Sequence, residues 1–195
     1  HGLDVPEFII ISHPAFLNSA TKLADFHRSY DGMEVEVHDN LECLADAEHL
    51  KSMDLIVPVW TMSEIDKDYT NNVSEAVAHG TGLAGVHGGM CDAFRNDPLW
   101  QFMTGGNWVA HPGGDGVEYT VKITDRETEL TAGIDDFQIT SEQYYLHVDP
   151  AARVLATTES SLPGVPASAI ARKPVPRAPR VTIKIRSFTN DDAPH

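Results

Sequence analysis

The sequence of 195 residues is poor in cysteine and in basic side chains. Its two cysteines, Cys43 and Cys91, are too few for a disulfide framework, which favours a reducing compartment. Lysine and arginine total 14 against 29 acidic residues, and the formal net charge of −15 repels the phosphate backbone of a nucleic acid. We therefore expect no nucleic-acid partner.

Long apolar runs and a secretory leader are also lacking. The sequence has no run of about 18 apolar residues, the length that spans a bilayer, so no membrane partner is expected. Residues 1–4 do not form a basic region followed by an apolar stretch, so no signal peptide is expected. These observations favour a cytoplasmic protein.

Short apolar segments alternate with segments of helical pattern through the first half of the chain. Short apolar runs predict strands at 8–12, 55–60 and 83–87, and alternation of apolar and acidic residues predicts a strand with one exposed face at 33–37. Apolar residues at helical spacing predict helices between these strands and after the last, at 20–30, 44–50, 68–78 and 93–103, the last of which Pro98 interrupts. This alternation predicts an α/β fold with a doubly wound, mostly parallel sheet and helices on both faces. Later strands are expected at 117–124, 137–140 and 153–157.

The C-terminal part differs in composition from the rest. Residues 160–180 contain five prolines among basic and small residues, and residues 151–195 carry a net positive charge. Such a segment is typical of a linker or extended arm. We therefore predict a folded domain at 1–159 and a Pro-rich basic tail at 160–195, in which 181–185 has the alternation of one further strand.

Three of the four expected strands of the first half are followed by side chains suited to a site. Ligands of open parallel sheets bind beyond the carboxyl ends of the strands, where His13, Trp60 and His87 are expected. His87 lies within Gly-Val-His-Gly-Gly at 85–89, the pattern of a nucleophile elbow, in which glycines surround a residue with a strained backbone. Imidazole at that position serves as a general base or a metal ligand, whereas a chance histidine in a glycine-rich turn is the alternative.

Further imidazole and carboxylate groups follow in the second half. His111 lies in a glycine-rich segment, 104–114, that is expected to be a loop, and Glu142 and His147 lie near each other in the chain. Together with His13 and His87 these side chains suit zinc or another divalent metal, although no pair has the spacing of a specific metal motif. Cys91 forms a displaced Cys–His pair with His87 or, as we favour, is a buried apolar residue.

Four of these segments together resemble the trehalose-utilisation (ThuA-like) family. The resemblance covers about residues 5–158 and rests on four motifs in the family's order. They are Gly-Leu-Ala-Gly-Val-His-Gly-Gly at 82–89, Trp-Gln-Phe-Met-Thr-Gly-Gly at 100–106, Ala-His-Pro-Gly at 110–113 and Ser-Glu-Gln-Tyr at 141–144. Residues 160–195 lack the aromatic-rich strand, the Gly-Lys-Gly-Arg-Val-type turn and the Gly-His step of the family.

The resemblance implies a class I glutamine amidotransferase-like fold, which is flavodoxin-like, and a role in sugar metabolism. It suggests a hydrolase or related enzyme that acts on a sugar or oxidised sugar and is not a glutamine amidotransferase. The alternative is a non-catalytic sugar- or metal-binding module that has lost the nucleophile. The expected partner is a small-molecule sugar. The sequence leaves open whether the chain forms a homo-oligomer. The expected catalytic residues are His87, His111 and Glu142, the expected substrate-binding residues are Trp60, Tyr144 and His147, and the expected metal ligands are His13, His87 and His111.

Overall fold

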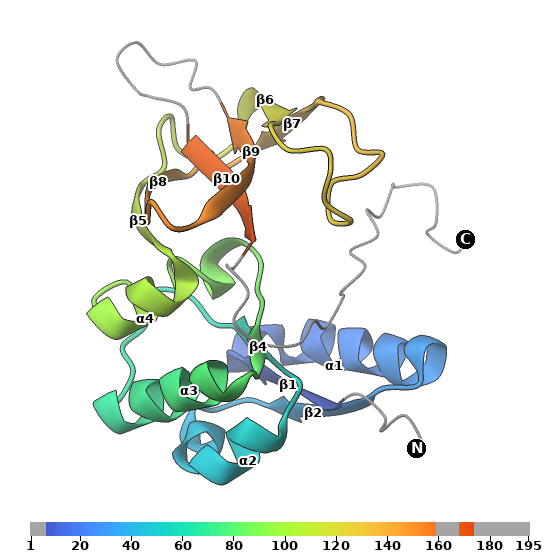
Figure 1. Ribbon diagram of the computed structural model, residues 1–195, viewed down its shortest axis with the longest axis vertical. Coiled ribbons are helices and arrows are strands. Elements are labelled where there is room, and N and C mark those ends of the chain that lie inside the picture. The colour runs from blue at the N-terminus through green and yellow to red at the C-terminus, as the bar shows by residue number, and fades with distance from the viewer. Residues whose placement is uncertain (1–6, 159–167, 174–195) are drawn as a thin grey trace.

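The computed structural model describes residues 7–158 and 168–173 (Figure 1). A four-stranded sheet occupies the first half, in the order β2-β1-β3-β4, and every neighbouring pair in it is parallel. The predicted parallel sheet is therefore confirmed. Its strands are β1 (Glu7–Ser12), β2 (Glu34–His38), β3 (Leu55–Val59) and β4 (Gly82–Leu83).

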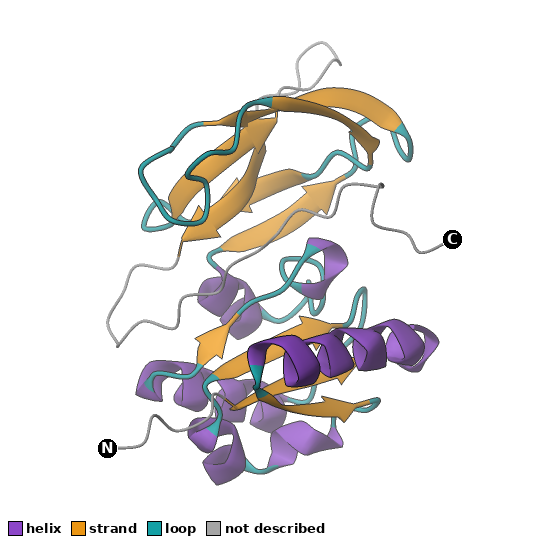
Figure 2. Cartoon of the chain, turned by 90° about the vertical axis from the view of Figure 1, so that its right-hand side faces the viewer, coloured by secondary structure: helices purple, strands orange, loops and turns teal. Residues whose placement is uncertain are grey.

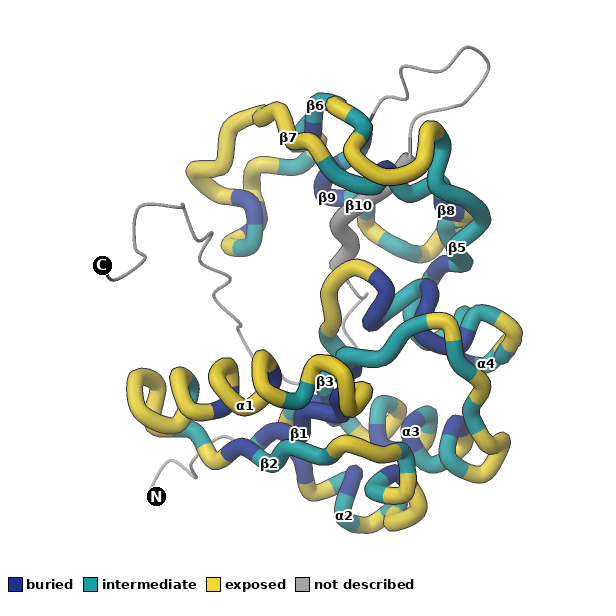
Figure 3. The backbone as a smooth tube through the Cα atoms, turned by 180° about the vertical axis from the view of Figure 1, so that it is seen from behind, coloured by how far each residue is buried: buried dark blue, intermediate teal, exposed yellow. Residues whose placement is uncertain are grey.

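Helices cover both faces of this sheet because successive side chains of each strand point to opposite faces. In β1, Phe8 and Ile10 pack with α1, whereas Ile9 and Ile11 pack with the helices of the other face. Most of α1 is exposed, and only its sheet-facing positions are buried (Figure 3). The helices are α1 (Leu17–Phe26), α2 (Ala47–Ser52), α3 (Lys67–His79) and α4 (Pro98–Thr104), with shorter helical turns at Pro14–Phe16, His27–Asp31, Glu42–Ala45 and His87–Gly89.

The fourth strand is shorter than the predicted 83–87, and Pro58 supplies the reason. The Ala84 N–H still donates to the Ile56 carbonyl oxygen at 3.1 Å. The next bond of a parallel ladder runs from the amide of residue 58 to the Ala84 carbonyl, and proline has no N–H to donate. The ladder therefore stops, and the chain leaves the sheet before His87.

Antiparallel strands form a second layer, which Figure 2 shows above the helices and the parallel sheet. One sheet has the order β10-β9-β6-β7, and β5 pairs with β8 in a separate ladder. The expected strands at 117–124, 137–140 and 153–157 are confirmed, whereas the expected loop at 104–114 contains a strand. The strands are β5 (Gly106–Ala110), β6 (Val117–Ile123), β7 (Phe137–Ser141), β8 (Tyr145–Val148), β9 (Arg153–Thr158) and β10 (Ser168–Lys173).

Two other predictions need correction. The helix expected at 93–103 begins only at Pro98, because a residue before proline disfavours helical backbone; Asp97 caps it by accepting the Trp100 N–H at 2.9 Å. Part of the expected linker, Ser168–Lys173, is a strand that pairs with β9. This six-residue run contains no proline, since Pro166 precedes it and Pro174 follows it. The predicted strand at 181–185 lies outside the described residues.

No helix in the described ranges, 7–158 and 168–173, is long and apolar enough to cross a membrane.

An ion-pair cluster on strand β2 gives a prediction about acid stability. Glu36 Oε2 lies 3.0 Å from Nε2 of both His38 and His49. The bond to His38 lowers the pKa of Glu36 below its usual 4.5, burial opposes this, and His49 adds to the lowering. A carboxylate whose pKa is lower in the folded than in the unfolded state stabilises the fold at pH values above its unfolded pKa. This stabilisation is lost as the pH falls through its folded pKa.

We therefore expect Glu36→Gln to lower the free energy of unfolding by about 0.5–1 kcal/mol near pH 6, because exposed ion pairs contribute little. The difference from wild type should shrink as the pH falls through the lowered folded pKa of Glu36, because the carboxylate takes up a proton there. Urea unfolding across this range measures it, with the exposed Glu34→Gln on the same strand as control. A difference that does not depend on pH would contradict the assignment to ionisation.

Candidate functional site

His87 has the backbone that the elbow pattern predicts. Its φ of 55° lies in the left-handed region, which non-glycine residues adopt rarely and which is common at functional sites. The two following glycines allow the turn to pack closely. A Cβ on Gly88 would overlap the Thr61 hydroxyl, and a Cβ on Gly89 would overlap the Pro58 carbonyl oxygen. The turn is thus wedged against the end of β3, with the imidazole 53% exposed.

Replacing Gly89 by alanine is expected to destabilise the chain by about 1–3 kcal/mol, since the overlapping atom belongs to the backbone and does not yield. Gly133→Ala is the matched control. Unlike Gly89, Gly133 has open space around it and a φ of 78°, so alanine there brings only left-handed strain, about 1 kcal/mol. Urea unfolding compares the two variants. Equal stability of Gly89→Ala and wild type would contradict the wedged turn.

Glu142 and Tyr144 bind the two nitrogens of the His87 ring. Nε2 lies 2.9 Å from Glu142 Oε2, and Nδ1 lies 2.9 Å from the Tyr144 hydroxyl. Both partners come from the extended segment between β7 and β8, in which alternate residues point the same way. The intervening Gln143 is buried. The Tyr119 hydroxyl donates to the Glu142 carbonyl oxygen at 3.1 Å and holds this segment to β6.

His111 joins the same cluster from the end of β5. The antiparallel register pairs Ala110 with Tyr145, so the residues beside them, His111 and Tyr144, meet. Their rings are 4.4 Å apart in an edge-on arrangement, and His111 Nε2 lies 3.8 Å from Glu142 Oε2. The structure therefore brings together the three residues expected to be catalytic, His87, His111 and Glu142, with Tyr144 among them.

A buried ion pair supports this cluster, and sequence reasoning missed it. The carboxylate of Asp92, which is 2% exposed, lies 2.6 Å from the Arg95 guanidinium. That guanidinium lies 3.9 Å from the centre of the Trp108 ring, and Trp108 in turn packs against His111 at 5.1 Å. The spacing of Asp92 and Arg95 in the sequence is ordinary, so only the fold reveals their position behind the site.

Burial raises the pKa of two acids in this cluster. Burial raises the pKa of Asp92, and the nearby Arg95 and His111 oppose this. Burial also raises the pKa of Tyr144, and the negative charges of Asp92 and Glu142 raise it further. The Tyr144 phenol therefore keeps its proton throughout the physiological range and is available as a hydrogen-bond donor.

The other predicted site residues have different ring partners. The ring of His13 contacts Trp60 at 5.2 Å and Phe16 at 6.1 Å, while Trp60 also packs against the apolar core. His147 is exposed on β8, where its ring lies 5.7 Å from that of Tyr145.

The expected metal ligands make different contacts. In the part of the chain that the structure describes, no three or more His, Cys, Asp or Glu side chains are placed to hold a metal ion. The expected ligands are also divided, because His13 lies with Trp60 whereas His87 and His111 share Glu142.

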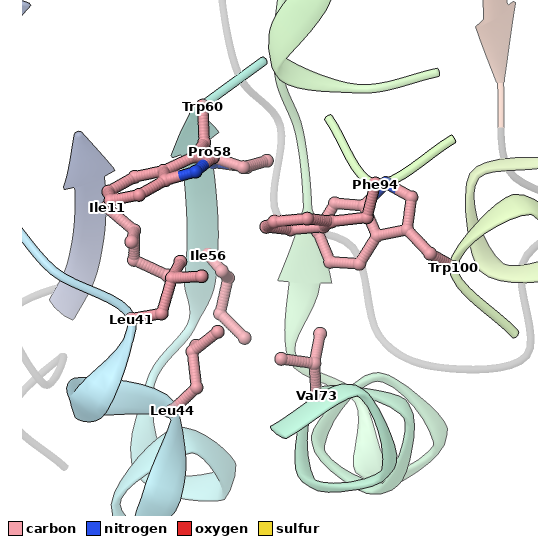
Figure 4. A pocket seen from close by; sticks show the side chains of 9 residues that line it. All are labelled: Ile11, Leu41, Leu44, Ile56, Pro58, Trp60, Val73, Phe94 and Trp100. Atoms are coloured by element: carbon pink, nitrogen blue, oxygen red, sulfur yellow. The ribbon is translucent and has the colours of Figure 1, made fainter. Parts of the chain in front are cut away.

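An apolar cavity beneath Trp60 is too small to bind a sugar. Its volume is about 10 Å³, which holds one water molecule at most. Figure 4 shows aliphatic and aromatic side chains around it, without a charged group. The lining residues are Ile11, Leu41, Leu44, Ile56, Pro58, Trp60, Val73, Phe94 and Trp100. It is a packing gap of the core.

Solved structures with the same architecture define the class of fold. A ThuA-like protein from Bacteroides uniformis has a TM-score of 0.68 at 15% identity, with 90% of this chain and 78% of that chain covered. A glutamine amidotransferase from Thermotoga maritima has a TM-score of 0.56 at 12% identity, with 80% of this chain and 69% of that chain covered. At these identities the likeness concerns the fold, which is class I glutamine amidotransferase-like.

The family is shown by sequence. The profile of the ThuA family, described as trehalose utilisation, matches residues 11–190, so the chain belongs to this family. The match extends further toward the C terminus than the resemblance over 5–158 predicts. No curated protein matches the chain. The chain is thus a carbohydrate-metabolism protein of the trehalose-utilisation type.

Proposed function

We propose that the chain is an enzyme of the cytoplasm that acts on a sugar or an oxidised sugar by acid–base catalysis at His87, in the manner of a hydrolase or a related enzyme. The observation that carries the proposal is the half-exposed imidazole of His87, held on a left-handed backbone with Nε2 2.9 Å from Glu142. A carboxylate in that position fixes the tautomer and stabilises the imidazolium formed on proton uptake.

The surroundings of His87 suit a polyhydroxylated ligand. Tyr144 and His111 offer aromatic faces next to hydrogen-bonding groups, and such a combination of flat apolar surface and polar tips matches a sugar ring. The Glu142 carboxylate next to His87 makes the site unattractive for a polyanion. These features favour a neutral sugar over a phosphorylated one.

The elbow residue argues against glutamine amidotransfer. That chemistry needs a nucleophile at the turn, and imidazole replaces it here. Cys91 follows the turn, and its carbonyl oxygen accepts the Trp108 N–H at 3.4 Å. A glutaminase assay that shows turnover, abolished by Cys91→Ser, would contradict this part of the proposal.

A non-catalytic sugar-binding module is the second candidate, because both ring nitrogens of His87 already have partners. Incubation of the purified chain with trehalose, or with trehalose oxidised to a ketone at one ring carbon, separates the two. Proton NMR follows turnover, and calorimetry follows binding. We expect product signals from at least one sugar. Binding without products favours the module, and neither binding nor products contradicts both candidates.

A further inference from the structure

The hydrogen bonds of His87 define where its proton lies. A carboxylate only accepts hydrogen bonds, so Nε2, facing Glu142, carries the hydrogen of the neutral ring. Nδ1 is then the acceptor, and the Tyr144 hydroxyl must donate to it. The lone pair that a general base needs is therefore not free for a substrate. It is already directed at the Tyr144 hydroxyl.

From this geometry we infer that Tyr144 is the catalytic residue that exchanges a proton with the substrate, while His87 is the base behind it and Glu142 orients His87. The inference rests on the proposed function and deepens it, since it names the group that touches the sugar. The arrangement follows the logic of a Ser-His-Asp triad, with a phenol in the place of the serine hydroxyl.

The proton transfer balances without a further reactant. A sugar hydroxyl gives its proton to Tyr144 Oη as the Tyr144 O–H proton passes to His87 Nδ1. The electron pair of the broken O–H bond stays on the sugar oxygen, and the imidazolium of His87 pairs with the Glu142 carboxylate. The reverse transfer returns the proton and leaves Tyr144 neutral. No phenolate accumulates, which agrees with the raised pKa of Tyr144.

The rings around Tyr144 hold its hydroxyl in place. The Tyr144 ring lies 4.7 Å from that of His87 and 4.4 Å from that of His111. Behind His111, Trp108 and Arg95 restrict the movement of this stack. The Tyr144–His87 hydrogen bond itself lies on the exposed side, where a sugar hydroxyl can reach it. A fixed and accessible hydroxyl is what proton transfer to a substrate requires.

Tyr144→Phe tests the inference because it keeps the ring and removes only the hydroxyl. With trehalose or its ketone as substrate, we expect kcat to fall by about 10²–10⁴-fold and KM to change much less. Tyr145→Phe is the matched control, since Tyr145 is the next residue and its ring faces His147. We expect this variant to keep the wild-type rate. Unchanged turnover in Tyr144→Phe, with His87→Ala inactive, overturns the role of Tyr144 and leaves the proposed function standing.

A second measurement does not depend on turnover. Nitrogen-15 NMR of the full chain reports the tautomer of His87, and we expect hydrogen on Nε2 and an acceptor signal at Nδ1. In Tyr144→Phe the Nδ1 signal should move to the position of an unbonded imine nitrogen. Hydrogen on Nδ1 in the wild type would overturn the inference, whatever the rates. Full turnover in His87→Ala would instead overturn the proposed function.

Discussion

Replacing His87 by alanine is expected to lower the turnover of a sugar substrate by about 10²–10⁴-fold, the usual contribution of a positioned acid–base group. The ring holds the Glu142 carboxylate on one side and the Tyr144 hydroxyl on the other, so its removal disconnects both. Stability should change by less than about 0.5 kcal/mol, because the side chain is 53% exposed. Steady-state kinetics and urea unfolding of the same preparation measure the two effects.

Two further histidine variants control this experiment. His79→Ala removes an exposed imidazole at the end of α3, away from the site, and should keep full turnover. His87→Gly removes the same ring but relieves the left-handed backbone, so it should be as inactive as alanine and more stable by about 1 kcal/mol. A loss of about 1–3 kcal/mol in His87→Ala, with turnover retained, would show that the ring is a structural group.

Trp100→Ala is expected to give the largest loss of stability, about 3–5 kcal/mol, as is usual for a buried aromatic side chain. Trp100 is 2% exposed and packs edge-on against Phe94, with the ring centres 4.7 Å apart. Its indole N–H also donates to the Met90 carbonyl oxygen at 2.8 Å, just after the elbow. The substitution therefore opens a cavity, removes one hydrogen bond to the Met90 carbonyl oxygen and loosens the segment behind His87.

Trp100→Phe separates these contributions. It keeps an aromatic ring against Phe94 but cannot donate to Met90, so we expect a smaller loss of about 1–3 kcal/mol. Urea unfolding measures both variants, and the His87 NMR signals show whether the elbow has moved. A loss below about 1 kcal/mol in Trp100→Ala would mean that this part of the core relaxes around the gap.

The parallel sheet was predictable because its signals are local. The run at 8–11 is buried on both faces and is apolar throughout, which distinguishes it from a half-exposed strand. The end of β4 was less predictable, because the missing N–H that stops it belongs to Pro58 on the neighbouring strand. The residue pattern of one strand does not show which backbone N–H groups the neighbouring strand can donate.

The candidate site was predictable in part for the same reason. His87 is marked by the glycines around it, and His111 and Glu142 by the family motifs. The strand Gly106–Ala110 was missed because the glycines and the His-Pro step around it are typical of a loop. Only its pairing with β8 shows that it is a strand. Asp92 carries no local signal, since its role arises from burial beside Arg95 and Trp108.

The site joins residues that are far apart in the chain, and this sets when it forms during folding. Tyr144 and His87 are separated by 57 positions, and each belongs to a different sheet layer. Contacts of such long range form only after the entropy of closing the intervening loop has been overcome. A chain emerging from the ribosome can complete the parallel sheet while β8 is still unmade. His87 then lacks both Glu142 and Tyr144, so the cluster is assembled only when the second layer forms.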